Sequence, residues 1–108
     1  MLIDAHHHLW DLDAVDYPWL NAKGVNRFFG DPTPIQRNYL LGEFRKEASE
    51  QGIRASVHIQ VGATDPWKEA KWVQSIADQN EDWPMAQIVF CDLTKPDIES
   101  QVDKFLTL

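Results

Sequence analysis

The stretch RASVHIQVGATDPWKEAKWVQSIADQNEDWPMAQIVFCD (residues 54–92) carries the pattern that decides the fold. Residues 54–61 alternate β-branched and polar side chains, which predicts a strand. Asp65-Pro66 predicts a helix start, with aspartate as the N-cap and proline at the first helical position. The run 85–92 is almost continuously apolar, as in a strand buried on both faces of a parallel sheet. The two strands begin 31 residues apart, which matches the roughly 30 residues of a βαβ unit.

Similar patterns flank this unit. Residues 2–6 (LIDAH) predict a short first strand. Residues 40–48 place apolar side chains at helical spacing, followed by Gly52 as a C-cap residue. Residues 94–97 (TKPD) match a capping box and precede an apolar helical face that begins at Ile98. The alternation of strands and helices predicts an α/β fold with a parallel sheet, organised as a single domain over residues 1–108.

Two features suggest that this sheet is part of a larger object. Residues 9–38 lack clean periodicity, and their aromatic side chains argue against disorder in what is an unusually long loop. Three parallel strands would also leave both sheet edges bare, whereas a complete (β/α)8 barrel needs about 250 residues. We therefore expect either a fragment, continuing past Leu108, or a chain that completes itself by self-association through the exposed edges.

Charge and composition narrow the range of partners. The net charge is −7, which disfavours nucleic acids and anionic membrane surfaces as partners. The chain has one cysteine, so no intrachain disulfide can form. The N-terminus lacks the pattern of a signal peptide, and no apolar run is long enough for a membrane span. These observations favour a cytoplasmic protein that acts on a small molecule.

Three consecutive histidines stand at the end of the first predicted strand. Because side chains alternate along a strand, His6 and His8 point to one side and His7 to the other. Two imidazoles at this spacing can lean onto one metal ion, for which zinc is the first candidate. The spacing alone leaves a merely structural cluster as an alternative. His7 is expected either to pack in the core or to support the metal ligands without binding the metal itself.

The segment Leu2–Trp10 (LIDAHHHLW) resembles the opening of the amidohydrolase-related (amidohydrolase 2) family, TIM-barrel hydrolases that include sugar and muconolactone-type lactonases. Later features are also similar to the family: the strand end VHIQ at 57–60, the helix segment EAKW at 69–72, and a third strand that ends in Asp92-Leu93. Val89 departs from the pattern, where a small residue is expected. The resemblance covers the first three β/α units, so it implies the first three strands of an incomplete (β/α)8 barrel.

The resemblance also implies a reaction and its residues. His6 and His8 match the first two metal-ligand positions, and a divalent metal or polar side chains would polarise the carbonyl of a lactone for attack by water. The general base is expected outside this chain, so the isolated chain is expected to be inactive. Trp10 and Gln60 are the expected substrate-binding residues, although a solvated strand-end amide is an equal reading of Gln60.

Two other interpretations compete with a lactonase. A TatD-like metal-dependent nuclease or phosphoesterase also opens with a D-x-H-x-H strand, although Trp10, the aromatic loop and the acidic charge favour the lactonase branch. A truncated, non-catalytic fragment is the third interpretation, because the later ligands and the base would be missing.

Overall fold

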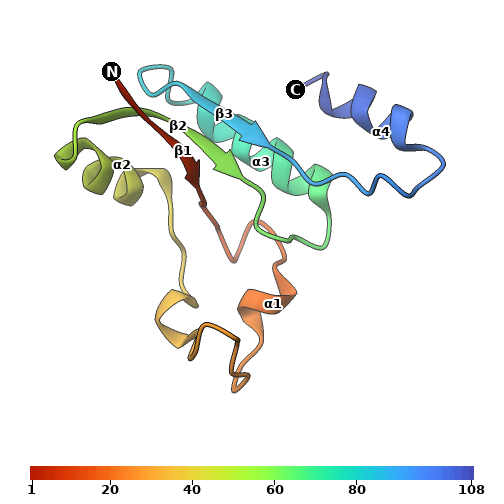
Figure 1. Cartoon of the computed structure of the whole chain (residues 1–108), viewed down its shortest axis with the longest axis horizontal. Helices are drawn as coiled ribbons and strands as arrows, with labels where there is room; N and C mark the ends of the chain where they lie inside the picture. The colour runs from red at the N-terminus through yellow and green to blue at the C-terminus, as the bar shows by residue number, and fades with distance from the viewer.

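A parallel three-stranded sheet in the order β1-β2-β3 forms the centre of the computed structural model, which describes residues 1–108 (Figure 1). The strands are β1 (Leu2–His7), β2 (Ile53–Ile59) and β3 (Met85–Ile88). Each predicted strand is present, and the parallel arrangement is confirmed. The parallel sheet predicted from the βαβ spacing is therefore present, and the structure adds that β2 lies in its middle.

Five helical segments connect and follow the strands. They are α1 (Pro18–Asn21), the 3-10 helix η1 (Thr33–Ile35), α2 (Leu41–Glu50), α3 (Pro66–Asp78) and α4 (Ile98–Phe105). The start of α3 is the predicted one, because an Asp65 carboxylate oxygen accepts the backbone N–H groups of Trp67 at 3.0 Å and Lys68 at 3.2 Å. None of the helices is both long and apolar enough to cross a bilayer.

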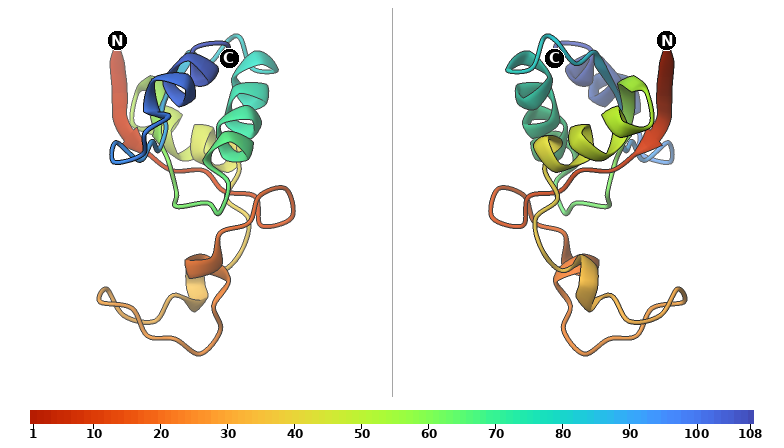
Figure 2. Two further views of the ribbon diagram at one scale, coloured as in Figure 1. Left: turned by 90° about the vertical axis from the view of Figure 1, so that its right-hand side faces the viewer. Right: turned by 90° about the vertical axis from the view of Figure 1, so that its left-hand side faces the viewer.

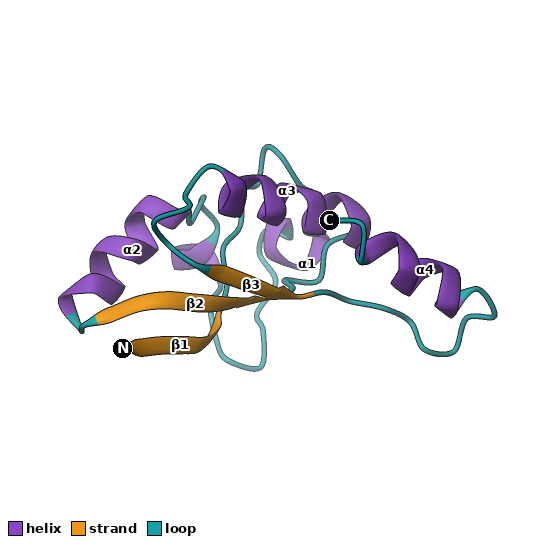
Figure 3. Cartoon of the chain, turned by 90° about the horizontal axis from the view of Figure 1, so that it is seen from above, coloured by secondary structure: helices purple, strands orange, loops and turns teal.

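The helices lie on one side of the sheet, and the other side is bare (Figure 3). The main core lies on the covered side, where Leu9 and Trp83 pack with the buried face of α2. On the strands, large apolar residues such as Ile3 (57% exposed) and Ile88 (55%) reach solvent. The expectation that residues 85–92 form a strand buried on both faces is therefore wrong for this chain: β3 ends at Ile88, and no layer covers its second face.

Most of the segment 9–38 extends away from the sheet as a separate lobe, whereas Leu9 stays in the main core (Figure 2). A second small core, built around Tyr17 and Leu20, holds the base of this lobe against Val61. The indole N–H of Trp19 also donates to the carbonyl of Val61 at 2.6 Å. The absence of periodicity in this segment is explained by its two very short helices, α1 and η1, which are separated by turns.

The predicted capping box before α4 does not form. Asp97 is the N-cap residue without a side-chain cap, and it instead accepts the amide of Gln101 at 2.8 Å. The Thr94 hydroxyl turns back to Asp92 at 2.6 Å. Helix α4 also buries no residue, and Leu106 just beyond it is 77% exposed. The apolar face of α4 is therefore only lightly packed on the rest of the molecule.

Candidate functional site

The His6 and His8 rings meet at the carboxyl end of β1. Their Nε2 atoms lie 3.3 Å apart, and the ring planes are inclined by 80°. The backbone N–H of His6 donates to the Asp4 carboxylate at 3.0 Å, which fixes the chain just before the pair. The strand alternation read from the sequence thus correctly placed the two imidazoles on one side of β1.

A contact across the sheet orients His8. Its Nδ1 lies 2.9 Å from the carbonyl oxygen of Ile59, at the carboxyl end of the neighbouring strand β2. Since a carbonyl oxygen can only accept, Nδ1 must carry the proton, and the lone pair is left on Nε2. That nitrogen faces His6, so His8 presents a fixed acceptor to whatever lies between the two rings.

The separation of the two nitrogens fits a shared metal ion. Two nitrogens at ~2.1 Å from a tetrahedral zinc ion are about 3.4 Å apart. The observed 3.3 Å needs almost no rearrangement of the rings. No group of three or more His, Cys, Asp or Glu side chains is arranged to hold a metal ion, so no third such side chain joins the pair.

His7 and His58 lie on the opposite, helix-covered side of the sheet. His7 stacks on Phe44 with ring centroids 4.0 Å apart and meets His58 edge-on at 5.6 Å. His58 donates its Nε2–H to the carbonyl of Leu9 at 3.2 Å. Burial is the main reason that the pKa of each falls to about 4, so both are neutral near pH 7. These two histidines are packing residues, as expected for His7.

The other two residues expected at the site make hydrogen bonds of their own rather than to the histidine pair. Trp10 donates its indole N–H to the carbonyl of Arg37, and its backbone pairs with Tyr39. Gln60 directs its side-chain oxygen to the backbone N–H of Gly62 at 2.7 Å, and it lines a cleft whose wall does not include His6, His8 or Trp10. In this chain the four residues therefore do not converge on one cavity.

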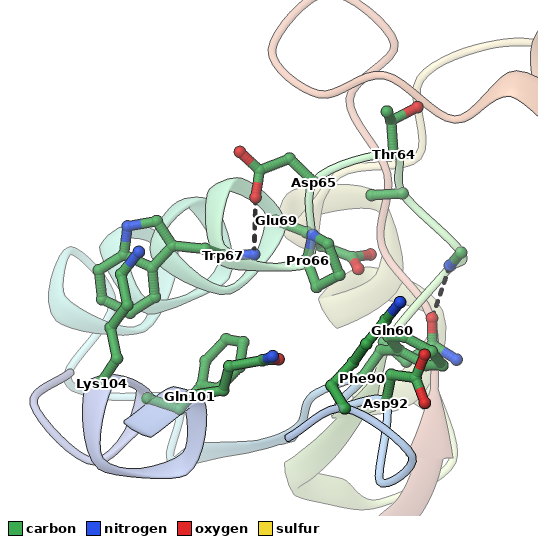
Figure 4. A pocket seen from close by; sticks show the side chains of 14 residues that line it. Gln60, Thr64, Asp65, Pro66, Trp67, Glu69, Phe90, Asp92, Gln101 and Lys104 are labelled. Atoms are coloured by element: carbon green, nitrogen blue, oxygen red, sulfur yellow. Dashed lines mark hydrogen bonds between the residues drawn. The ribbon is translucent and has the colours of Figure 1, made fainter. Parts of the chain in front are cut away.

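That cleft, of about 590 Å³, lies between the start of α3, the chain after β3, and α4 (Figure 4). Trp67, Phe90 and Phe105 supply its aromatic surface, and Lys95 and Lys104 bring positive charge. None of these residues was predicted from the sequence to be a site residue. These residues follow a strand or lie on a helix, and the sequence does not reveal how those segments are placed relative to one another.

Glu69 contributes a buried carboxyl group to the wall of the cleft. It is 3% exposed, and one carboxylate oxygen accepts the backbone N–H of Val61 at 2.8 Å. Burial raises its pKa, and the hydrogen bond from Val61 opposes this rise. Glu69 therefore joins α3 to the end of β2, which fixes one side of the cleft.

Comparison with known proteins points to the amidohydrolases. No protein-family model matches the chain. The uncharacterized protein y4mH of Sinorhizobium fredii is 37% identical over 107 residues, which is 97% of this chain and 36% of that protein. The structure of amidohydrolase 2 from Bifidobacterium longum subsp. infantis is similar with a TM-score of 0.53 and 28% identity, covering 68% of this chain and 27% of that one. The chain thus spans between about a quarter and about a third of the length of these relatives, and it resembles part of an amidohydrolase.

Proposed function

We propose that this chain carries half of the metal site of an amidohydrolase-type hydrolase, with His6 and His8 as ligands of a divalent metal, zinc first. The carrying observation is the 3.3 Å separation of the two Nε2 atoms, with His8 anchored on Ile59. The similarity to amidohydrolase 2 supports the reaction class. We further propose that the three strands are the first three of a (β/α)8 barrel, in which strand ends form the catalytic face.

The proposed reaction is the opening of a lactone, of the sugar or muconolactone type, by water. A bound divalent metal would polarise the carbonyl group of the ester. His8 is held in its tautomer by Ile59, and His6 completes the pair from the same side of β1. Trp10 directly follows the pair and fixes the start of the aromatic lobe through Arg37, so we assign it to the wall beside the substrate. Gln60 is assigned to the strand-end surface next to β2.

We also propose that the 108 residues alone do not turn over substrate. A hydrolytic zinc site keeps three protein ligands and an open position, and a base must activate the water. The chain offers two ligands at the pair and no larger metal-competent group. Metal binding is therefore expected to be weak, and the general base is expected from outside this chain.

Zinc titration of the chain, followed by the imidazole resonances of His6 and His8 in NMR spectra, tests the metal site. Zn²⁺ should shift both rings together. His6→Ala and His8→Ala should each weaken binding by roughly tenfold or more, since loss of even an outer partner of a ligand costs about 10- to 100-fold. His7→Phe is the matched control, because His7 lies on the other side of the sheet and its stacking on Phe44 is kept. Unchanged zinc affinity in both alanine variants would exclude the pair as the site.

Hydrolysis is measured separately with zinc present. Glucono-δ-lactone in a pH-stat and bis(4-nitrophenyl) phosphate in a colorimetric assay represent the lactonase and the TatD-like alternatives. We expect no turnover of either by the purified chain. Lactone turnover that disappears in His6→Ala would refute the proposed inactivity while supporting the site. Phosphodiester turnover that disappears in the same variant would favour the nuclease-like alternative over the lactonase.

A further inference from the structure

We propose that the cleft between α3 and α4 is a binding site for a small aromatic carboxylate, separate from the His6–His8 pair. The cleft volume of about 590 Å³ lies within the range of small-molecule sites, which is roughly 300–1,000 Å³. The site does not depend on a metal at the histidines, because neither histidine is part of its wall.

The carboxylates in the wall are already engaged by the protein. Asp65 accepts the N–H groups at the start of α3, and Asp92 accepts both the N–H and the hydroxyl of Thr94. Glu69 is buried and accepts the N–H of Val61. One oxygen of each of these three carboxylates is thus held by the fold, and the bonds from Thr94 lower the pKa of Asp92.

The ammonium groups in the same wall are free of carboxylate partners. The ion pairs of the chain are Arg37–Glu43 and Arg45–Asp82, and neither involves Lys95 or Lys104. Lys104 instead places its Nζ 4.5 Å from the centre of the Trp67 ring. Two lysine ammonium groups outside any ion pair therefore line the cleft, in a protein whose net charge is −7.

Aromatic side chains lie beside these donors. Figure 4 shows Lys104 next to the Trp67 indole, with Phe90 further along the wall. Phe105 meets Trp67 edge-on with ring centroids 5.7 Å apart. The aromatic ring of a ligand can pack on these side chains while the carboxylate of the same ligand binds a lysine ammonium group. The two kinds of contact do not compete, because they involve different ends of the ligand. Phenylacetate has this chemistry and is the probe.

The test is an NMR titration of the ¹⁵N-labelled chain with phenylacetate, observing the Trp67 indole N–H. We expect saturable shifts at Trp67 and on α4. Phenylacetamide, which has the same ring without the charge, should bind about fivefold more weakly or worse, a factor that corresponds to ~1 kcal/mol. Inorganic phosphate should not displace phenylacetate at equal concentration.

Variants connect the binding to the two lysines. Lys95→Met and Lys104→Met should each weaken phenylacetate binding about fivefold. Lys68→Met is the matched control, because Lys68 is an exposed residue of α3 that does not line the cleft. The proposal is overturned if no saturable shift occurs, if phenylacetamide binds equally well, if phosphate competes equally, or if the control variant loses as much affinity as the other two.

Discussion

Acidification should unfold this protein through two buried histidines, His7 and His58. Both are neutral in the folded state because burial lowers their pKa values from 6.5 to about 4. In the unfolded chain they regain ordinary values and take up protons below about pH 6.5. The unfolded state then binds more protons, so the free energy of unfolding falls as the pH drops from 6.5 towards 4.

The size of this effect follows from the shift. Between about pH 7 and pH 5 each histidine should remove about 2 kcal/mol from the free energy of unfolding, and the two together about 4 kcal/mol. Below the folded pKa of about 4 their contribution levels off. Glu69 acts in the opposite direction: burial raises its pKa, so the unfolded chain loses this proton first and the free energy of unfolding falls as the pH rises.

Urea unfolding monitored by tryptophan fluorescence at about pH 7 and about pH 5 measures the effect. His7→Phe keeps the stacking on Phe44 but cannot titrate, and it should lose about half of the pH dependence. It should not destabilise the protein at pH 7, because neither ring nitrogen of His7 has a hydrogen-bond partner to lose.

His58→Gln and His6→Gln complete the comparison. In His58→Gln a side-chain N–H can still reach the carbonyl of Leu9, but the titrating group is gone. This variant should therefore lose the other half of the pH dependence of the free energy of unfolding. His6→Gln is the control, because its ring is exposed on the other side of β1, and it should keep the full pH dependence. A His7→Phe variant with the pH dependence of the unaltered protein would refute burial of His7 as the cause.

Two further predictions concern packing and assembly. Gly62→Ala should lower the free energy of unfolding by roughly 1–2 kcal/mol because of the positive φ of +76°, and further because the new Cβ would lie 3.2 Å from Trp19 Nε1. Gly24→Ala also has a positive φ but lies in open space, so it should lose only the amount caused by the backbone conformation. Equal losses in the two variants would exclude the contact with Trp19 as a cause. Self-association through the bare sheet should make the sedimentation coefficient rise with protein concentration, and Ile88→Lys should suppress this rise. A chain that stays monomeric at every concentration would contradict the prediction.

The sequence predicted those parts of the fold that depend on local patterns. Asp65-Pro66 forms the expected helix start because its capping bonds span only three residues. Thr94 shows the limit of such patterns, since its hydroxyl bonds to Asp92 behind it rather than capping α4 ahead of it. The short helices α1 and η1 have too few residues for a period to be visible.

The same distinction holds for the candidate sites. The His6–His8 pair follows from the two-residue period of one strand, so it was predictable without a tertiary structure. The cleft was not, because Trp67, Phe90 and Lys104 come from separate elements. Their convergence depends on where α4 lies against α3. Because α4 buries no residue, the hydrophobic pattern of the sequence does not specify that position.

The alternation that separates the histidines also links stability to metal binding. Coordination needs deprotonated imidazoles, and a charged neighbour would repel a dication. Burial keeps His7 neutral at pH 7 although it stands between His6 and His8 in the chain, so His7 adds no positive charge beside the pair. Acid should therefore weaken the fold through His7 and His58, which are not the residues proposed to bind zinc. In His7→Phe the two effects should separate: stability at about pH 5 should rise, while zinc affinity at about pH 7 should stay the same. A parallel change in both would show that the two sides of β1 are not independent.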